Sequence, residues 1–193
     1  MLGRLIGLSG EKMTFAYGKL LPLSFIAVGI LFLGLVVYFA SISNGISNAM
    51  VALAVITIFA IVLFFGISPL LTSHEITGNF LILRQGWYFN RAIPLKYVDN
   101  ADHFSGKTYG LSIKYRPHLR RLYVLTDERN KIILTMRDDV YIKIFLRRNA
   151  VREIVINVNN TKTFIDKINS IKKQLYDSLE YREKIGREML SDE

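Results

Sequence analysis

The residues of this chain that could perform chemistry are three histidines and a few carboxylates, and their spacing fits no catalytic or metal-binding motif. His74, His103 and His118 lie far apart, and none has a second ligand at the spacing of a helical zinc site. Asp99, Asp102 and His103 come close together, so a divalent cation is one interpretation. In a strand, however, Asp102 would point away from the other two. We expect a solvated strand edge there and no metal site.

Other signatures of catalysis are missing from the sequence as well. Cysteine is absent, which excludes a thiol nucleophile, a cysteine zinc site and disulfides. The sequence contains no glycine-rich phosphate loop and no Gly-x-Ser-x-Gly turn. Asp138 and Asp139 are better explained by a turn than by a pair of catalytic carboxylates. We therefore expect that the protein is not an enzyme, uses no cofactor and takes no small-molecule substrate.

Two arginine clusters carry the strongest binding signal. Arginine suits phosphate and carboxylate groups because its planar guanidinium donates two parallel hydrogen bonds. One cluster precedes a predicted strand, and the other falls in the expected turn between the last two strands. The candidate residues for binding lipid or an acidic partner are Arg116, Arg120, Arg121, Arg147, Arg148 and Arg152. The competing interpretation is a solvated basic rim.

The chain as a whole is basic, with 25 Lys and Arg against 16 Asp and Glu and a net charge of +9. Nucleic acid is a common reason for such an excess. Anionic lipid head groups attract basic segments at the inner face of a membrane as well. Because the rest of the sequence predicts a membrane protein, we expect contact with anionic lipid heads and no nucleic acid.

The candidate arginines and carboxylates follow a long segment of the chain that carries no charge. From Leu20 through His74 the sequence contains no Asp, Glu, Lys or Arg. A bilayer core of about 30 Å needs about 20 helical residues, so the segment is long enough to cross twice. Residues 41–48 are rich in Ser, Asn and Gly, which favour a turn. The prediction is a transmembrane helical hairpin over residues 20–72, with helices at about 20–42 and 50–71.

The flanks of the hairpin predict its orientation. Lys and Arg occur before the first helix and after the second, and the connecting turn has neither. Basic flanks stay in the cytoplasm, so we expect a multi-pass protein of the cell (inner, cytoplasmic) membrane with both termini cytoplasmic. Lys19, Trp87 and Tyr88 are the candidate residues at the membrane interface. Packing of Trp87 and Tyr88 in the strand core is the alternative.

The two predicted spans offer no charged path for an ion or a proton. Ala27, Gly34 and Ser41 recur every seven residues, so one side of the first helix is small. That side would let the second helix or another protein approach closely, although small residues are also common in such helices. The hairpin is therefore predicted to anchor and pack.

Residues 75 to about 160 contain many short apolar runs that predict strands of an antiparallel sandwich or barrel. Leu122–Thr126 and Ile132–Met136 flank a turn-rich tetrapeptide, which predicts a hairpin. Phe164, Ile168, Ile171 and Leu175 then share one helical face, and Asn160 with Thr161 can cap the start of this helix. Residues 1–19 are expected to form a cytoplasmic segment, with an interfacial helix as one interpretation, and residues 181–193 a polar tail.

Three segments resemble the bacterial and archaeal pleckstrin-homology-like membrane proteins. They are the run His74–Gly86 just after the hairpin, the segment Arg91–Leu95, and the strand, Asn-rich turn and helix start at Ile154–Ile165. The resemblance covers roughly residues 20–176, and Asn159–Thr161 stands where many members carry Asp-Pro. It implies a pleckstrin-homology-like (PH-like) barrel or sandwich, capped by a C-terminal helix, over residues 73–180. In this family the fold serves binding more than catalysis.

The sequence therefore predicts a membrane-anchored binding or scaffolding module. Its expected partner is another membrane protein, as in an accessory subunit of a larger complex, or a second copy of itself. The alternative is an oligomeric pore or transporter component built from several hairpins.

Overall fold

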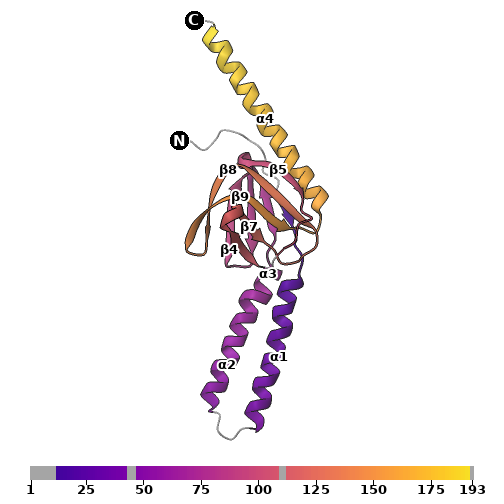
Figure 1. Cartoon of the computed structure of the whole chain (residues 1–193), viewed down its shortest axis with the longest axis vertical. Coiled ribbons are helices and arrows are strands. Elements are labelled where there is room, and N and C mark those ends of the chain that lie inside the picture. The colour runs from indigo at the N-terminus through magenta and orange to yellow at the C-terminus, as the bar shows by residue number, and fades with distance from the viewer. Residues whose placement is uncertain (1–11, 43–46, 109–111, 192–193) are drawn as a thin grey trace.

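The computed structural model describes residues 12–42, 47–108 and 112–191, with side chains through Tyr176. A helical hairpin, a β domain and a long terminal helix follow one another along its longest axis (Figure 1). The helical segments of the hairpin are α1 (Leu20–Ile42), α2 (Asn48–Ile61), the π-helical η1 (Val62–Ile67) and α3 (Ser68–Leu70). The last three form one continuous rod.

Both rods of the hairpin are long and apolar enough to span a membrane, at 23 residues each. Only 11% and 6% of their most apolar windows are buried inside the molecule. A core helix of a water-soluble domain would bury most of its apolar face, and these do not. The helical hairpin predicted from the charge-free segment is therefore confirmed as a structural element.

The two rods touch at glycines. A Cβ added at Gly29 would lie 2.1 Å from Val62 Cγ2, and one added at Gly66 would lie 2.7 Å from Ile26 Cγ1. Close approach at glycine is a common way for apolar helices to pack. Gly66 belongs to the π-helical turn η1, so the contact lies near the end of the hairpin that joins the β domain.

The stripe of Ala27, Gly34 and Ser41 is not this contact. A Cβ at Gly34 would meet nothing within 4 Å, and Ala27 and Ser41 are exposed. The expectation that this stripe receives the second helix is therefore wrong, because the helical rotation that buries Gly29 turns the stripe outward. Its use by another protein stays a prediction.

The β domain consists of two sheets. The first has the order β1-β2-β3-β4, with all pairs antiparallel. The second has the order β5-β8-β9-β7-β6. The strands are β1 (Met13–Phe15), β2 (His74–Thr77), β3 (Phe80–Gln85), β4 (Phe89–Pro94), β5 (Val98–His103), β6 (Ile113–Arg116), β7 (Arg121–Val124), β8 (Lys131–Ile144) and β9 (Arg147–Asn157). The short 3₁₀ turns η2 (Leu95–Tyr97) and η3 (Pro117–Leu119) complete the domain.

The N-terminal segment joins the first sheet. Strand β1 pairs with β2 and buries Phe15, so this part of residues 1–19 is not an interfacial helix. Met1–Glu11, where the other residues of that expected helix fall, lies outside the described residues. Within residues 13–15 the side chains alternate as in a strand, with Thr14 exposed and Phe15 buried.

The predicted hairpin between β7 and β8 does not form. Strand β9 lies between them, and it pairs in parallel with β7 and antiparallel with β8. The intervening residues bond elsewhere: the Thr126 N–H donates to Asn157 Oδ1 at 3.0 Å, and the Leu21 N–H donates to the Thr126 carbonyl at 2.8 Å. The sheet is therefore mixed, and the expectation of a purely antiparallel domain is wrong.

Asp138 and Asp139 lie inside the long strand β8 and not in a turn between strands. They fall where the pairing register of β8 with β9 shifts, between Thr135 and Val140. Such an irregularity re-aims side chains, and Asp139 pairs with Arg120 at 2.5 Å.

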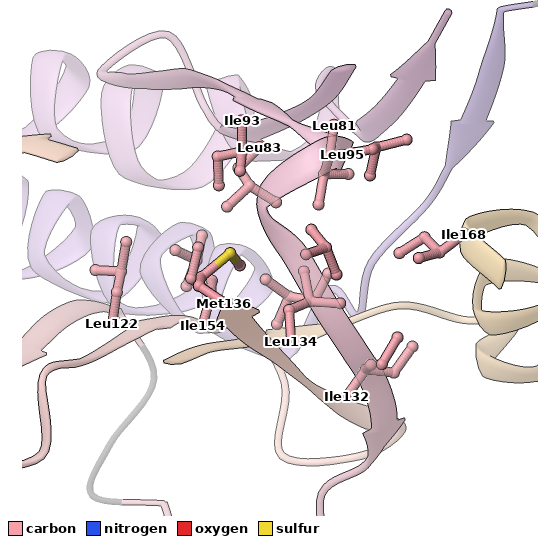
Figure 2. Close-up of a cluster of buried hydrophobic side chains, with 14 of the residues drawn as sticks. Leu81, Leu83, Ile93, Leu95, Leu122, Ile132, Leu134, Met136, Ile154 and Ile168 are labelled. Atoms are coloured by element: carbon pink, nitrogen blue, oxygen red, sulfur yellow. The ribbon is translucent and has the colours of Figure 1, made fainter. Parts of the chain in front are cut away.

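The two sheets face each other over a single large apolar core. Figure 2 shows one layer of this core facing the other, with Ile168 of the terminal helix at one end. All the labelled side chains are fully buried or nearly so. Besides Ile168, they are Leu81, Leu83, Ile93 and Leu95 from the first sheet and η2, and Leu122, Ile132, Leu134, Met136 and Ile154 from the second.

The terminal helix α4 (Thr161–Ser191) closes one end of this core. Asn160 caps it by accepting a bond from the Thr163 N–H at 3.2 Å, as predicted. Phe164 and Ile168 are fully buried, and the Phe164 ring meets Phe15 edge-on at 4.9 Å. The helix continues past residue 180, where a polar tail was expected to begin. Its 31 residues measure about 46 Å at 1.5 Å each, so it projects well beyond the β domain (Figure 1).

Candidate functional site

The most elaborate polar arrangement in the described residues lies where the hairpin enters and leaves the β domain. On the outgoing side, Gly86 and Trp87 form a turn that docks on the end of the second rod. The Trp87 N–H donates to Ser68 Oγ at 2.6 Å, and the Gly86 N–H donates to Thr72 Oγ1 at 2.9 Å. Gly86 has a φ of +62°, and a Cβ there would lie 2.6 Å from Ser68 Oγ. Only glycine fits this turn.

On the incoming side, Tyr17 connects the chain before α1 to the same rod. Its hydroxyl donates to the Pro69 carbonyl at 2.7 Å and lies 2.5 Å from Thr72 Oγ1. Tyr17 is 3% exposed, and burial raises the pKa of its phenol. Both ends of the hairpin are thus fixed to each other and to the first sheet.

His74 lies at the centre of this junction. Its Nδ1 accepts a hydrogen bond from the backbone N–H of Arg84 at 3.2 Å, and its ring lies tilted against the Tyr17 ring, with the ring centroids 5.0 Å apart. It is 1% exposed, and burial lowers the pKa of its imidazole from 6.5 to about 3. The ring is therefore a buried, neutral part of the β domain.

The neighbouring Glu75 is buried too, but it is paired. Its Oε1 accepts from Arg84 Nη1 at 2.7 Å and lies 3.3 Å from Lys12 Nζ. A buried carboxylate is stable only when it is paired and hydrogen-bonded. This ion pair therefore ties β2, β3 and the N-terminal strand region together directly beside His74.

Aromatic rings cover the outside of the junction. Trp87 meets Phe64 edge-on at 6.2 Å, Tyr88 lies 5.4 Å from Phe65, and Phe65 stacks on Phe25 at 5.5 Å. Trp87 is 55% exposed, and burial raises the pKa of the half-buried Tyr88 to about 12. Two candidate interface residues thus lie at the domain end of the hairpin, and the third, the exposed Lys19, directly precedes α1. Their contact with lipid remains a prediction.

The six candidate arginines do not form one site. Arg120 pairs with Asp139, Arg121 pairs with Glu153 at 2.5 Å, and Arg116 also has a partner. The backbone N–H of Arg152 donates to the Arg120 carbonyl at 2.8 Å, so Arg152 lies next to this group. Internal ion pairs thus engage two of the six arginines that were expected to meet lipid or an acidic partner.

Arg147 and Arg148 lie elsewhere, at the start of β9. They were expected in a turn together with Arg152, but that turn consists of Phe145 and Leu146, and all three arginines are in the strand. Arg147 and Arg152 are five positions apart along the strand, a distance of about 17 Å. Arg147 and Arg148 are exposed and form a separate basic surface.

The Asp99, Asp102 and His103 segment is the exposed edge strand β5. Asp102 accepts a bond from the Asn100 amide at 2.5 Å. Among the side chains that the structure describes, no group of three His, Asp or Glu is arranged to hold a metal ion.

Sequence reasoning missed the residues that build the junction. In the sequence, Tyr17, Ser68 and Thr72 are single polar residues beside an apolar span. Their hydrogen-bond partners lie far away in the sequence. The only local signal is the Gln85-Gly86 turn, which marks the end of β3. In comparisons with protein-family models, curated proteins and solved structures, nothing matches this chain.

Proposed function

We propose that this protein is a membrane-anchored binding or scaffolding module of the cell membrane. In this proposal α1 and the rod from α2 to α3 cross the bilayer, and both termini face the cytoplasm. The charge-free segment, the exposed apolar faces of both rods and the basic flanks support it. The β domain and α4 then stand in the cytoplasm next to the membrane.

The observation that carries the proposal is the junction. A simple tether needs only a flexible linker, but here Tyr17, Ser68 and Thr72 bond the hairpin ends to the β domain. Such an arrangement fixes the direction of the β domain and of α4 relative to the helices. A fixed direction is useful when a surface must be presented to a partner in the same membrane.

We further propose that the β domain is PH-like. Two facing sheets closed by a C-terminal helix support this relationship, together with the segments His74–Gly86 and Arg91–Leu95. The parallel β7–β9 pair departs from a simple antiparallel barrel. Fold alone does not determine function, so the scaffold role depends on the junction and on α4.

The partner of the proposed scaffold is another membrane protein or a second copy of the chain, and α4 is the surface that reaches furthest. A photo-crosslinker attached to a single cysteine at Lys173→Cys, on the exposed side of α4, tests this in native membranes. The expected product is a discrete adduct with a second polypeptide. A matched label at Glu128→Cys, in the exposed β7–β8 loop, should give none. A Lys173→Cys protein that forms no adduct and purifies in gentle detergent as a bare monomer would contradict the scaffold role.

A further inference from the structure

Two bulky apolar side chains stand exposed at the tip of the β8–β9 hairpin. Phe145 is 68% exposed and Leu146 is 92% exposed. They form the two-residue turn between Ile144 and Arg147, which are paired. Such turns normally carry Asn-Gly or a similar pair, because they need positive φ angles. Phe145 has a φ of +51°, so the chain places a bulky residue where glycine or asparagine would be less strained.

The tip lies on the side of the β domain that carries the helices. Arg91 Nε donates to the Lys143 carbonyl at 2.6 Å. This bond joins the β8–β9 hairpin to β4 just before the tip. Strand β4 begins at Phe89, immediately after the Trp87 turn that packs on the rod. In Figure 1 the β8–β9 hairpin projects sideways from the β domain, and its tip bends toward the end of the domain from which α1 and α2 leave.

Basic residues surround the apolar tip. Lys143, Arg147 and Arg148 are exposed on either side of it, and no Asp or Glu occurs from Val140 through Ala150. Apolar side chains within a basic collar match the interface of an anionic membrane, where hydrocarbon lies directly below phosphate groups. A second copy of this chain is a poorer occupant, because the chain carries a net charge of +9.

We propose that the β8–β9 tip is a second membrane contact, in which Phe145 and Leu146 enter the interface and Lys143, Arg147 and Arg148 bind lipid phosphates. The inference rests on the proposed function, since the tip reaches the bilayer only when the helical hairpin spans it. The role of the contact is to hold the β domain against the surface at a second point, well to the side of the helices. It would thereby support the direction of the β domain that the junction sets.

The test uses the full chain in nanodiscs, with an environment-sensitive fluorophore at a single cysteine. Because the natural sequence has no cysteine, Leu146→Cys reports the tip alone. Lys173→Cys on α4 is the aqueous control, and Ile56→Cys, exposed on α2, is the membrane control. The discs contain phosphatidylcholine with one third phosphatidylglycerol, or phosphatidylcholine alone. Spin-labelled lipids report membrane contact, and iodide reports exposure to water.

In the anionic discs the fluorophore at position 146 should be quenched several-fold more by shallow spin-labelled lipid than the one at 173. Combining Lys143→Glu, Arg147→Glu and Arg148→Glu should lower this quenching to the level seen in neutral discs. A label at 146 as accessible to iodide as the label at 173, while position 56 is quenched by deep spin labels, would overturn the tip contact and leave the anchor standing. Iodide access at position 56 as well would contradict both proposals.

Discussion

The helical hairpin and the β domain are built from the same apolar residue types, but the hairpin exposes these side chains and the β domain buries them. Leu31 and Ile56 of the hairpin are 63% and 64% exposed, whereas Leu81 and Leu134 of the β domain are fully buried. The β domain satisfies its apolar side chains by packing one sheet on the other. The helical hairpin leaves them exposed, as the proposed membrane anchor requires. The polar junction lies between these two regions.

The largest expected difference between the two regions is their response to loss of a leucine side chain. Leu134→Ala should lower the free energy of unfolding by about 2–5 kcal/mol, because it leaves a cavity in a close-packed core. Leu31→Ala should change it by less than about 0.5 kcal/mol, because Leu31 is 63% exposed. Denaturation in mild detergent, followed by circular dichroism, measures both. Equal losses would mean that Leu31 is buried in an assembly.

The helix contact within the hairpin gives a matched pair of glycines. Gly29→Ala should cost about 1–3 kcal/mol, since the new methyl group would overlap Val62 and push the rods apart. Gly34→Ala meets no atom within 4 Å and should be neutral or slightly stabilising. Thermal unfolding in the same detergent compares the two variants. A more harmful change at Gly34 would instead indicate that the small-residue stripe is an interface with another protein.

His74 should make the stability of the β domain depend on pH, whereas residues 20–71 of the helical hairpin contain no titratable side chain other than Tyr38. The unfolded imidazole binds a proton near pH 6.5, but the folded one does so only near pH 3, because burial lowers its pKa. Its stabilising contribution is therefore complete above pH 6.5 and is lost as the pH falls toward 3. Between pH 6 and 5 the free energy of unfolding should fall by about 1.4 kcal/mol per pH unit.

His74→Asn keeps an acceptor for the Arg84 N–H but does not titrate. The slope of stability between pH 5 and 6.5 should therefore disappear in this variant. Asp127 does not interfere in that window, because its hydrogen bond with Arg129 holds the pKa of its carboxyl below 3.8. An unchanged slope would show that another group causes the pH dependence.

The smallest expected effect is at the junction itself. Tyr17→Phe removes a buried hydroxyl that donates to Pro69, and it should cost about 1 kcal/mol. Tyr38→Phe, at the far end of α1 where the ring is 59% exposed, should cost less than half of that. Hydrogen exchange at the Gly86 and Trp87 amides adds a local measurement, and both should exchange faster only in Tyr17→Phe. Identical exchange in both variants would argue against a rigid junction.

The sequence was sufficient where the signal is local. The charge-free segment predicts the hairpin, and the spacing of Phe164, Ile168 and Ile171 predicts the buried face of α4. Both patterns can be recognised within one continuous stretch of the sequence. Strand pairing is different, because it depends on contacts far along the chain. Strand β9 inserts between β7 and β8, and no local feature of the Asp127–Asn130 turn reveals this.

The candidate site could be predicted least well, for the same physical reason. Tyr17, Ser68 and Thr72 become a site only when the helical hairpin brings residues about 50 positions apart together. The arginines show the opposite error, since a basic run such as Arg120-Arg121 looks free in the sequence. In the folded domain Asp139 and Glu153 neutralise it.

The position of the two ends of the molecule relative to the membrane tests the proposed membrane-spanning anchor most directly. Asn48→Cys labels the start of α2, and Lys173→Cys labels α4, each as the only cysteine of the chain. In intact cells a membrane-impermeant maleimide should modify position 48 and leave position 173 unmodified until the membrane is opened. Labelling of position 173 in intact cells, or of both positions only after the membrane is opened, would contradict an anchor that spans the membrane with the β domain inside.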